Sequence, residues 1–137
     1  MRVMLEGLLS LVEREDQFEV NGRRSTVLGI IPPRIVDERL IGELKMQLMR
    51  YLNPAAAEGA TPSDYCLDFS KVNYFSTAAI GGMRVFNKVH RELRGSPVAL
   101  IADSGSRAYQ VFEKTRLTSE FNLFYTLEDY KRSIGAG

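Results

Sequence analysis

The fold is decided by a central stretch, residues 64–103, which reads DYCLDFSKVNYFSTAAIGGMRVFNKVHRELRGSPVALIAD. Its first six residues are typical of a strand, and PVALIAD is a second strand with Pro97 at its first position, where the missing N–H does no harm. Between them, residues 76–95 carry apolar side chains at helical spacing and end at Gly95, a residue typical of helix ends. The stretch predicts strand, helix, strand, with an inward helix side formed by Ile80, Met83, Phe86, Val89 and Leu93.

Upstream of this stretch, the sequence predicts a hairpin and a further helix. QFEV and RRSTVLGII flank Asn21-Gly22, the strongest two-residue hairpin signal. Val27–Ile31 is almost continuously apolar, so this strand is expected to be buried on both faces. Pro33 can open a helix that ends before Asn53-Pro54. Its apolar stripe is expected to contain Leu40, Ile41, Leu44, Leu48 and Leu52.

Downstream, SGSRAYQVFEKTRL predicts a helix with Ala108, Val111, Phe112 and Thr115 inward, and NLFYT predicts a short strand. LEDYKRSI predicts a last helix capped by Thr126. The order β-β-α-β-α-β-α-β-α is typical of a mixed sheet with helices packed on it. The chain is therefore predicted to contain one α/β domain, residues 17–137, preceded by an extension, residues 1–16.

The extension is predicted to be helical over Val3–Arg14, although Gly7 weakens the pattern. An apolar stripe left uncovered usually binds a partner, so the extension is expected either to pack on the domain or to form a homodimer, and we favour the homodimer. The stripe consists of Leu5, Leu8, Leu9 and Val12.

Composition narrows the classes of function. The 137 residues include 45% hydrophobic and 26% charged residues, which is typical of a soluble globular domain. Eighteen basic and seventeen acidic residues leave a net charge of +1, which argues against nucleic acid as the main partner. No apolar run is long enough to cross a membrane, and the N-terminus is too charged for a signal peptide. A cytoplasmic location is the expectation.

The residues for a catalytic or metal site are too few. The single cysteine, Cys66, is expected to be buried and inert within a strand. His90, the single histidine, lies at the margin of a helical stripe and is interpreted as a partly buried helix residue. Asp64 and Asp68 flank Cys66 without a nearby histidine to complete a metal set. We therefore expect no catalytic residue, no metal and no cofactor.

Several separated segments together resemble the STAS domain family, specifically the bacterial anti-sigma factor antagonists. They are LDFSKVNYFSTAAIGGMRVFNKVHRELRGSPVALI, from Leu67, and YQVFEKTRLTSEFNLFYTLEDYKRSI, up to Ile134. In VFEKTRLTSEF, Phe112, Leu117 and Phe121 hold the family's apolar places, and Arg116 stands where a helix-ending glycine is usual. The resemblance implies a STAS-like mixed sheet and a regulatory, non-enzymatic module. Its partner would be an anti-sigma factor that is also a serine/threonine kinase.

The resemblance further implies a phosphorylation switch at the start of the central helix. The family's phosphoacceptor position falls on Thr77, and its preceding Asp falls on Ser76, which is the second choice for the acceptor. The following small residue and glycine fall on Ala78 and Ala79, and the next glycine falls on Gly81. Read from the residues alone, the Ser-Thr pair is a helix cap worth about 1 kcal/mol, a task that Ser76 can perform and for which Thr77 is not needed.

The docking surface is expected where the central helix begins. The loop Pro32–Asp37 should meet this end of the sheet, together with the opening of the next helix. The expected partner-binding residues are Pro33, Arg34, Asp37, Phe75, Ser76, Thr77, Ala78, Gly81, Ser104 and Gly105. Two alternatives stay open: a STAS scaffold without phosphorylation, and a domain that binds a small ligand such as a nucleotide or a lipid.

Overall fold

The computed structural model describes residues 11–30, 38–52, 63–72 and 79–135, with the side chains of 38–41 left aside. These residues form one mixed sheet of five strands in the order β1-β2-β3-β4-β5. Only β1 is antiparallel to its neighbour. The strands are β1 (Val12–Val20), β2 (Arg23–Ile30), β3 (Ser63–Asp68), β4 (Ala99–Ile101) and β5 (Asn122–Phe124). The helices are α2 (Glu38–Leu52), α3 (Ile80–Arg94), α4 (Arg107–Lys114), the 3-10 turn η3 (Leu117–Ser119) and α5 (Leu127–Ile134).

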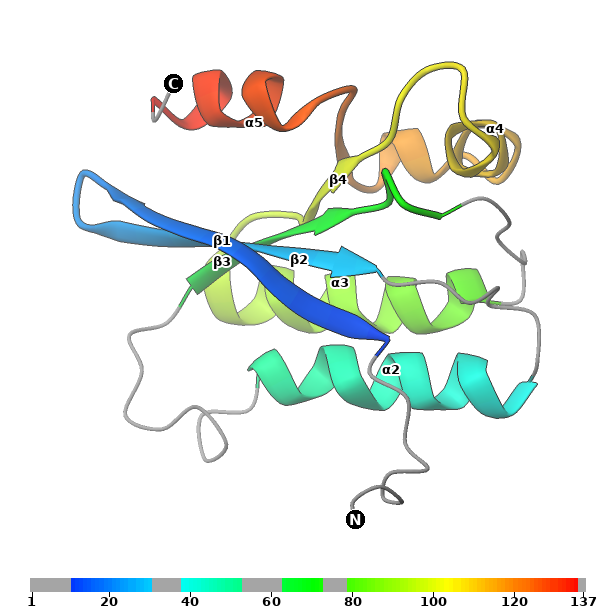
Figure 1. The fold of residues 1–137 in the computed structure, drawn as a ribbon. Helices are drawn as coiled ribbons and strands as arrows, with labels where there is room; N and C mark the ends of the chain where they lie inside the picture. The colour runs from blue at the N-terminus through cyan, green and yellow to red at the C-terminus, as the bar shows by residue number, and fades with distance from the viewer. Residues whose placement is uncertain (1–10, 31–37, 53–62, 73–78, 136–137) are drawn as a thin grey trace, which may run out of the picture.

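The helices cover the two faces of the sheet unequally. In Figure 1, α2 and α3 lie side by side below the sheet, and α5 lies on its opposite side. Each parallel connection between neighbouring strands is right-handed by rule, which places the connecting helices on one face. Side chains of α2, α3 and α4 accordingly share one core cluster. The smaller second cluster lies around Cys66 and Tyr130, beneath α5.

The hairpin prediction is confirmed. Val20 pairs with Arg23, and Asn21 and Gly22 both have positive φ, 53° and 81°. Two successive positive φ angles define the type I′ turn, whose twist matches that of the flanking strands. β2 is buried on both faces as expected, because Val27 belongs to the cluster beneath α5 while Leu28 belongs to the opposite one.

The predicted N-terminal helix is not seen. Residues 12–14, its expected end, lie in β1, and this strand runs through the expected domain boundary at residue 16. Leu11 and Val12 are buried, and both backbone N–H groups donate to Gln47 Oε1 of α2, at 2.7 and 3.1 Å. Pairing with β2 satisfies the backbone of this segment, which a short helix weakened by Gly7 would satisfy less well. Residues 1–10, with the rest of the proposed dimer stripe, lie outside the described residues.

The inward side of α3 is confirmed at Ile80, Met83 and Phe86, all buried. The expectation for Leu93 is wrong, because 52% of this residue is exposed. His90 and Asn87 are buried instead. Sequence periodicity predicts that polar side chains are exposed. These two are buried because both form hydrogen bonds with backbone groups inside the fold.

The remaining helix signals are largely confirmed. In α2, Leu44, Leu48 and Leu52 are buried, while the side chains of Leu40 and Ile41 lie outside the described set. Gly95 ends α3 in the left-handed conformation, with φ 81°. Thr126 caps α5, because its side chain accepts a hydrogen bond from the backbone N–H of Asp129 at 3.0 Å.

Candidate functional site

The carboxyl ends of β2, β3, β4 and β5 meet at one edge of the sheet, the position where α/β sheets commonly bind their ligands. The described part of this edge comprises Phe69–Val72 after β3, Asp103–Ser106 after β4, and Tyr125 after β5. The start of α3, including Gly81, lies at the same end. We call these residues the docking edge.

Three of the ten sequence-predicted binding residues belong to the described docking edge. Gly81, Ser104 and Gly105 are all exposed. A Cβ added at either glycine would meet no heavy atom within 4 Å, so both positions are open to solvent. The other seven predicted residues, including Ser76 and Thr77, lie outside the described residues. Their roles as cap, acceptor or contact stay predictions.

The loop between β4 and α4 is held in one conformation by its own hydrogen bonds. Ser106 donates from its N–H and its Oγ to the Asp103 carbonyl, at 2.9 and 2.7 Å. Its Oγ also accepts from the Tyr109 N–H at 3.1 Å, which makes Ser106, not Ser104, the cap of α4. Ser104 and Gly105 therefore stand at the exposed tip of an ordered turn, where a partner would bind without first ordering the loop.

An aromatic pair stands beside this loop. The rings of Tyr109 and Tyr125 meet edge to face with centroids 5.7 Å apart, and 49% of Tyr125 is exposed. A side-chain hydrogen bond with Tyr125 raises the pKa of Tyr109. Exposed tyrosines are enriched among the residues that dominate protein interfaces. The sequence does not predict the pair, because its members lie on different elements. A large aromatic residue directly after a strand, such as Tyr125, could still have been chosen as a candidate for the binding edge.

Two carboxyl groups approach each other at the end of β3. The side chain of Glu15 lies across Gly29, where an added Cβ would overlap Glu15 Oε2, and Gly29 is the register partner of Asp68, so the two carboxyl groups are neighbours. Burial, followed by the hydrogen bond and the charge of Asp68, raises the pKa of Glu15 to about 7 against the opposing effect of Lys71. The Lys71 Nζ lies 3.7 Å from Glu15 Oε2. No local sequence pattern indicates this cluster, because it depends on a β-bulge between Arg14 and Asp16 that brings Glu15 over the neighbouring strand.

The polar side chains considered for catalysis have structural roles. His90 is fully buried, its Nε2 accepts from the Tyr65 N–H at 3.0 Å, and its Nδ1 lies 2.8 Å from the Ser96 carbonyl. Cys66 is buried and its thiol pKa is well above the ordinary value because of that burial. Asp64 pairs with Arg23 at 2.9 Å. Within residues that the structure describes, no three His, Cys, Asp or Glu side chains are grouped to hold a metal.

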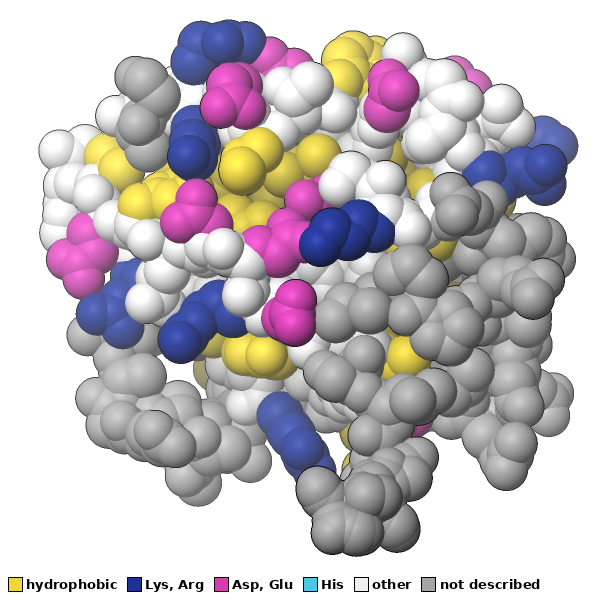
Figure 2. Space-filling model, viewed as in Figure 1, with side chains coloured by type: hydrophobic (Ala, Val, Ile, Leu, Met, Phe, Trp, Pro, Cys, Tyr) yellow, Lys and Arg dark blue, Asp and Glu magenta, His cyan; other side chains and the backbone are white. Residues whose placement is uncertain are grey.

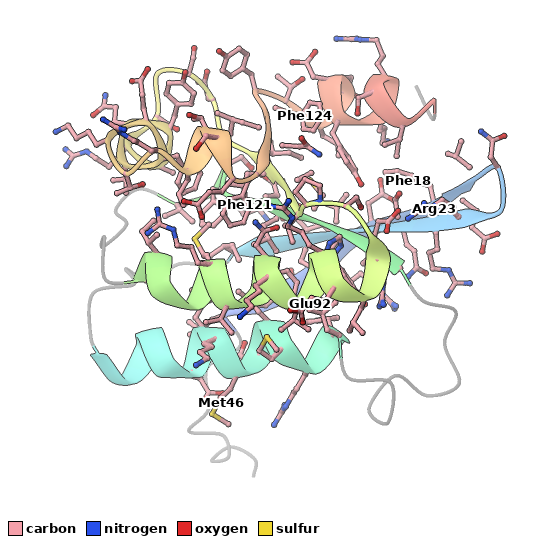
Figure 3. The ribbon with its side chains drawn as sticks, turned by 180° about the vertical axis from the view of Figure 1, so that it is seen from behind. Phe18, Arg23, Met46, Glu92, Phe121 and Phe124 are labelled. Carbon is pink, nitrogen blue, oxygen red and sulfur yellow. The ribbon has the colours of Figure 1, made fainter. Side chains whose placement is uncertain are left out.

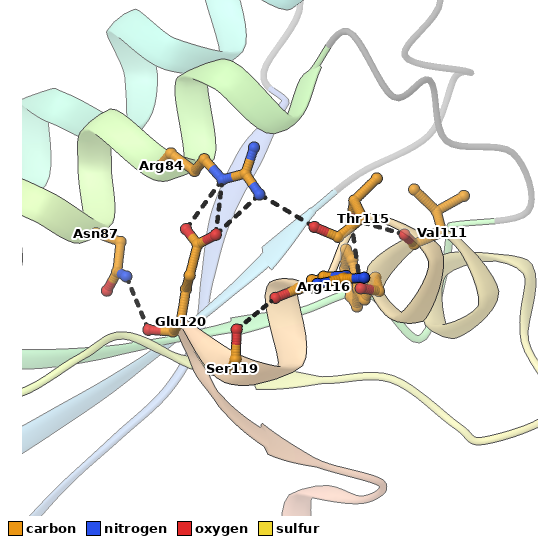
Figure 4. Close-up of polar contacts among 8 residues, drawn as sticks. Arg84, Asn87, Val111, Thr115, Arg116, Ser119 and Glu120 are labelled. Carbon is orange, nitrogen blue, oxygen red and sulfur yellow. Dashed lines mark hydrogen bonds and ion pairs between the residues drawn. The ribbon is translucent and has the colours of Figure 1, made fainter.

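The segment VFEKTRLTSEF, at the end of α4 and after it, has the buried apolar residues and the glycine-like turn that were expected for it. Phe112, Leu117 and Phe121 are all buried, and Arg116 has a left-handed backbone with φ 62°, the conformation that favours glycine. Arg84 of α3 holds this segment through Glu120: its Nε and Nη2 donate to the carboxylate at distances from 2.8 to 3.1 Å (Figure 4).

The face that carries α5 is mixed in character. Figure 2 shows hydrophobic side chains gathered between α5 and the β1–β2 hairpin, interspersed with acidic and basic ones. Phe18 packs against the core cluster beneath α5, and the Lys131 Nζ lies 5.4 Å from its ring centroid. Among the described helices, none is long and apolar enough to cross a membrane.

Comparison with known proteins supports the fold. The structure matches the crystal structure of a candidate anti-sigma factor antagonist from Thermotoga maritima with a TM-score of 0.62. The match covers 88% of this chain and 93% of that chain, at 15% sequence identity. No family model matches the chain, and the comparison with curated proteins finds no significant match. The expected resemblance to the antagonists is thus confirmed at the level of the fold.

Proposed function

We propose that this chain is a regulatory protein-binding module of the anti-sigma factor antagonist type, which binds an anti-sigma factor with kinase activity. The observation that carries the proposal is the shared fold with the Thermotoga maritima protein over nearly the full length of both chains. The exposed, ordered turn at Ser104 and Gly105 and the exposed Tyr125 ring support it, because they offer a preformed surface at the predicted end of the sheet.

Phosphorylation of Thr77 is the proposed switch. A phosphate there would add about −1.5 to −2 charges at neutral pH. A partner surface that fits a neutral hydroxyl would lose its electrostatic complementarity, so binding would end without the fold being lost. Ser76 is proposed to act as a cap ahead of α3, because Ala79, the N-cap position of the helix in the structure, has no side-chain cap bond. The two adjacent hydroxyls then have different tasks.

The test uses the full chain and the anti-sigma factor kinase encoded nearest to it. Wild-type chain, Thr77→Ala and Ser76→Ala are incubated with the kinase and ATP, and phosphate is located by mass spectrometry. We expect Thr77→Ala to bind the partner and to accept no phosphate. Ser76→Ala should still be phosphorylated and should lose about 0.5–2 kcal/mol of unfolding free energy.

Three outcomes decide between the functions. Phosphate on Ser76 with Thr77 untouched would exchange the two roles. Binding without any phosphorylation would favour a scaffold that lacks the switch. No binding to any co-encoded kinase, together with a small molecule that co-purifies with the chain, would favour the ligand-binding alternative.

A contact test uses the exposed edge directly. Gly105→Arg should weaken partner binding by placing a long charged side chain on the tip of the turn, where the structure has open space. Leu93→Arg is the control, because this residue is 52% exposed and lies near the C-terminal end of α3, opposite the docking edge. Equal affinity for both variants would argue against this edge as the interface.

A further inference from the structure

The end of β3 contains a carboxyl pair that none of the roles described above requires. Glu15 reaches it only because β1 contains a bulge and because Gly29 has no side chain in the way. The pair joins three strands at one point: Glu15 comes from β1, its carboxyl group lies over β2, and Asp68 is the last residue of β3. Gly29 and Asp68 are also paired across the sheet.

The surroundings of the pair determine how it can respond to a proton. The side chain of Glu15 is 22% exposed, and Asp68 is 9% exposed, so water screens their mutual repulsion only partly. A hydrogen bond between two carboxyl groups needs a proton on one of them. Asp68 Oδ1 also accepts from the Ser70 N–H at 2.9 Å.

Two charged groups among the described residues lie near the pair. The Lys71 Nζ lies 3.7 Å from Glu15 Oε2, close enough to take over that carboxylate. Asp16, the next residue of β1, is paired with Lys131 of α5 at 3.5 Å. The Cys66 thiol beneath the pair is buried, and because burial raises its pKa it stays neutral.

We propose that Glu15 and Asp68 form a proton-operated latch that fixes the start of the segment after β3. With a proton between them, the pair joins the β1 bulge to the end of β3. When the proton leaves, the two carboxylates repel, Glu15 turns toward Lys71, and Ser70–Val72 take a different position. The edge of the sheet then carries one more negative charge. The latch belongs to the folded chain and does not depend on the proposed partner.

The proton is expected to leave near neutral pH. Burial and the hydrogen bond with Asp68 raise the pKa of Glu15 to about 7, from an ordinary value of 4.5. The folded chain then binds more protons than the unfolded chain between these two pH values. Its stability should therefore fall as the pH rises through this window and level off above it.

The experiment follows the side chain and the segment separately by NMR. The Glu15 carboxyl carbon and the amide groups of Ser70, Lys71 and Val72 are recorded in the full chain from about pH 4 to pH 9, a range that spans both values. We expect a common midpoint near 7. In Glu15→Gln, which keeps a hydrogen-bond donor and cannot ionise, the amide transition should disappear. In Lys71→Met it should persist with a higher midpoint, because the group that favours ionisation is gone.

A glycine variant tests the geometry. Gly29→Ala places a Cβ where the Glu15 carboxyl lies, so the carboxyl must move away and its midpoint should drop toward 4.5. Gly42→Ala, with no atom within 4 Å of the new Cβ, is the matched control and should leave the midpoint unchanged. A Glu15 midpoint near 4.5 in the wild type, or an amide transition that survives in Glu15→Gln, would overturn the proposal.

Discussion

Replacing His90 by leucine should be among the most damaging changes on α3. A backbone N–H only donates and a carbonyl only accepts, so the partners of His90 assign the neutral tautomer with its proton on Nδ1. The ring thus joins the Tyr65 N–H of β3 to the Ser96 carbonyl after α3. Leucine has a similar volume and can replace neither bond.

The expected loss of unfolding free energy follows from the two backbone groups that lose their partner, the Tyr65 N–H and the Ser96 carbonyl. An unsatisfied buried donor costs about 1–3 kcal/mol, which applies to the Tyr65 N–H. Ser96 is only half-buried, so water can reach its carbonyl and its cost lies at the lower end. We expect His90→Leu to lower the unfolding free energy by about 2–4 kcal/mol, a large share of the 5–15 kcal/mol typical of a domain.

The assay is urea unfolding followed by circular dichroism at several pH values. With a slope of about 2 kcal/mol per molar urea, the midpoint should fall by about 1–2 M near pH 7.5. Leu93→Ala, at an exposed position on the same helix, is the control and should change stability by less than about 0.5 kcal/mol.

The pH dependence provides an independent check. Burial lowers the pKa of His90 below 6.5, so the unfolded chain gains a proton first as the pH falls. The stabilisation by His90 is complete above the unfolded pKa and declines as the pH falls below it. The difference between wild type and His90→Leu should therefore shrink from pH 7.5 to pH 5. A constant difference, or one below about 1 kcal/mol throughout, would refute the assigned tautomer and its two bonds.

Two further changes test the segment after α4. Arg116→Gly should raise the unfolding free energy by about 0.5–1 kcal/mol in urea unfolding, because relief of the left-handed backbone exceeds the added chain entropy, whereas Arg116→Ala should not. Equal stability of the two variants would argue against strain at this residue. Arg84→Ala should cost about 0.5–1 kcal/mol at low salt and less at high salt, because its contact with Glu120 is exposed (Figure 4). A salt-independent loss would instead point to the bond that Arg84 donates to the Thr115 carbonyl at 3.1 Å.

The sequence by itself determined the features that rest on local interactions. The type I′ turn at Asn21-Gly22, the left-handed helix end at Gly95 and the cap at Thr126 each depend on residues a few positions apart. Apolar periodicity located the helices and strands from β2 onward, because the period of each element places its apolar side chains on one face. These signals were sufficient for the mixed sheet and for the resemblance in fold.

Only the tertiary structure decided what depends on contacts between distant residues. β1 forms at residue 12 because β2 and Gln47 offer partners for its backbone, which no local pattern reveals. His90 and Asn87 are polar, so periodicity alone would place both side chains outside, yet both are buried. Backbone groups from other segments bind them: the Asn87 side chain accepts from the Val98 N–H at 2.8 Å and donates to the Glu120 carbonyl at 3.0 Å.

The outer surface of the helical layer shows the same limit of periodicity. Figure 3, viewed from behind, shows Met46 pointing away from α2, and 57% of this residue is exposed. Leu93 is likewise apolar and exposed. An apolar residue type alone does not place a side chain inside, because the position of the neighbouring elements decides how wide the buried stripe of a helix is.

The carboxyl pair is the clearest case of a feature that only the fold creates. Glu15 and Asp68 are 53 positions apart (68 − 15), and each alone is an ordinary acidic residue. A bulge moves Glu15 over Gly29, strand pairing places Asp68 opposite this glycine, and partial burial lets water screen the two carboxyl groups only in part. The perturbed acidity of Glu15 is therefore a property of three strands meeting and not of either residue.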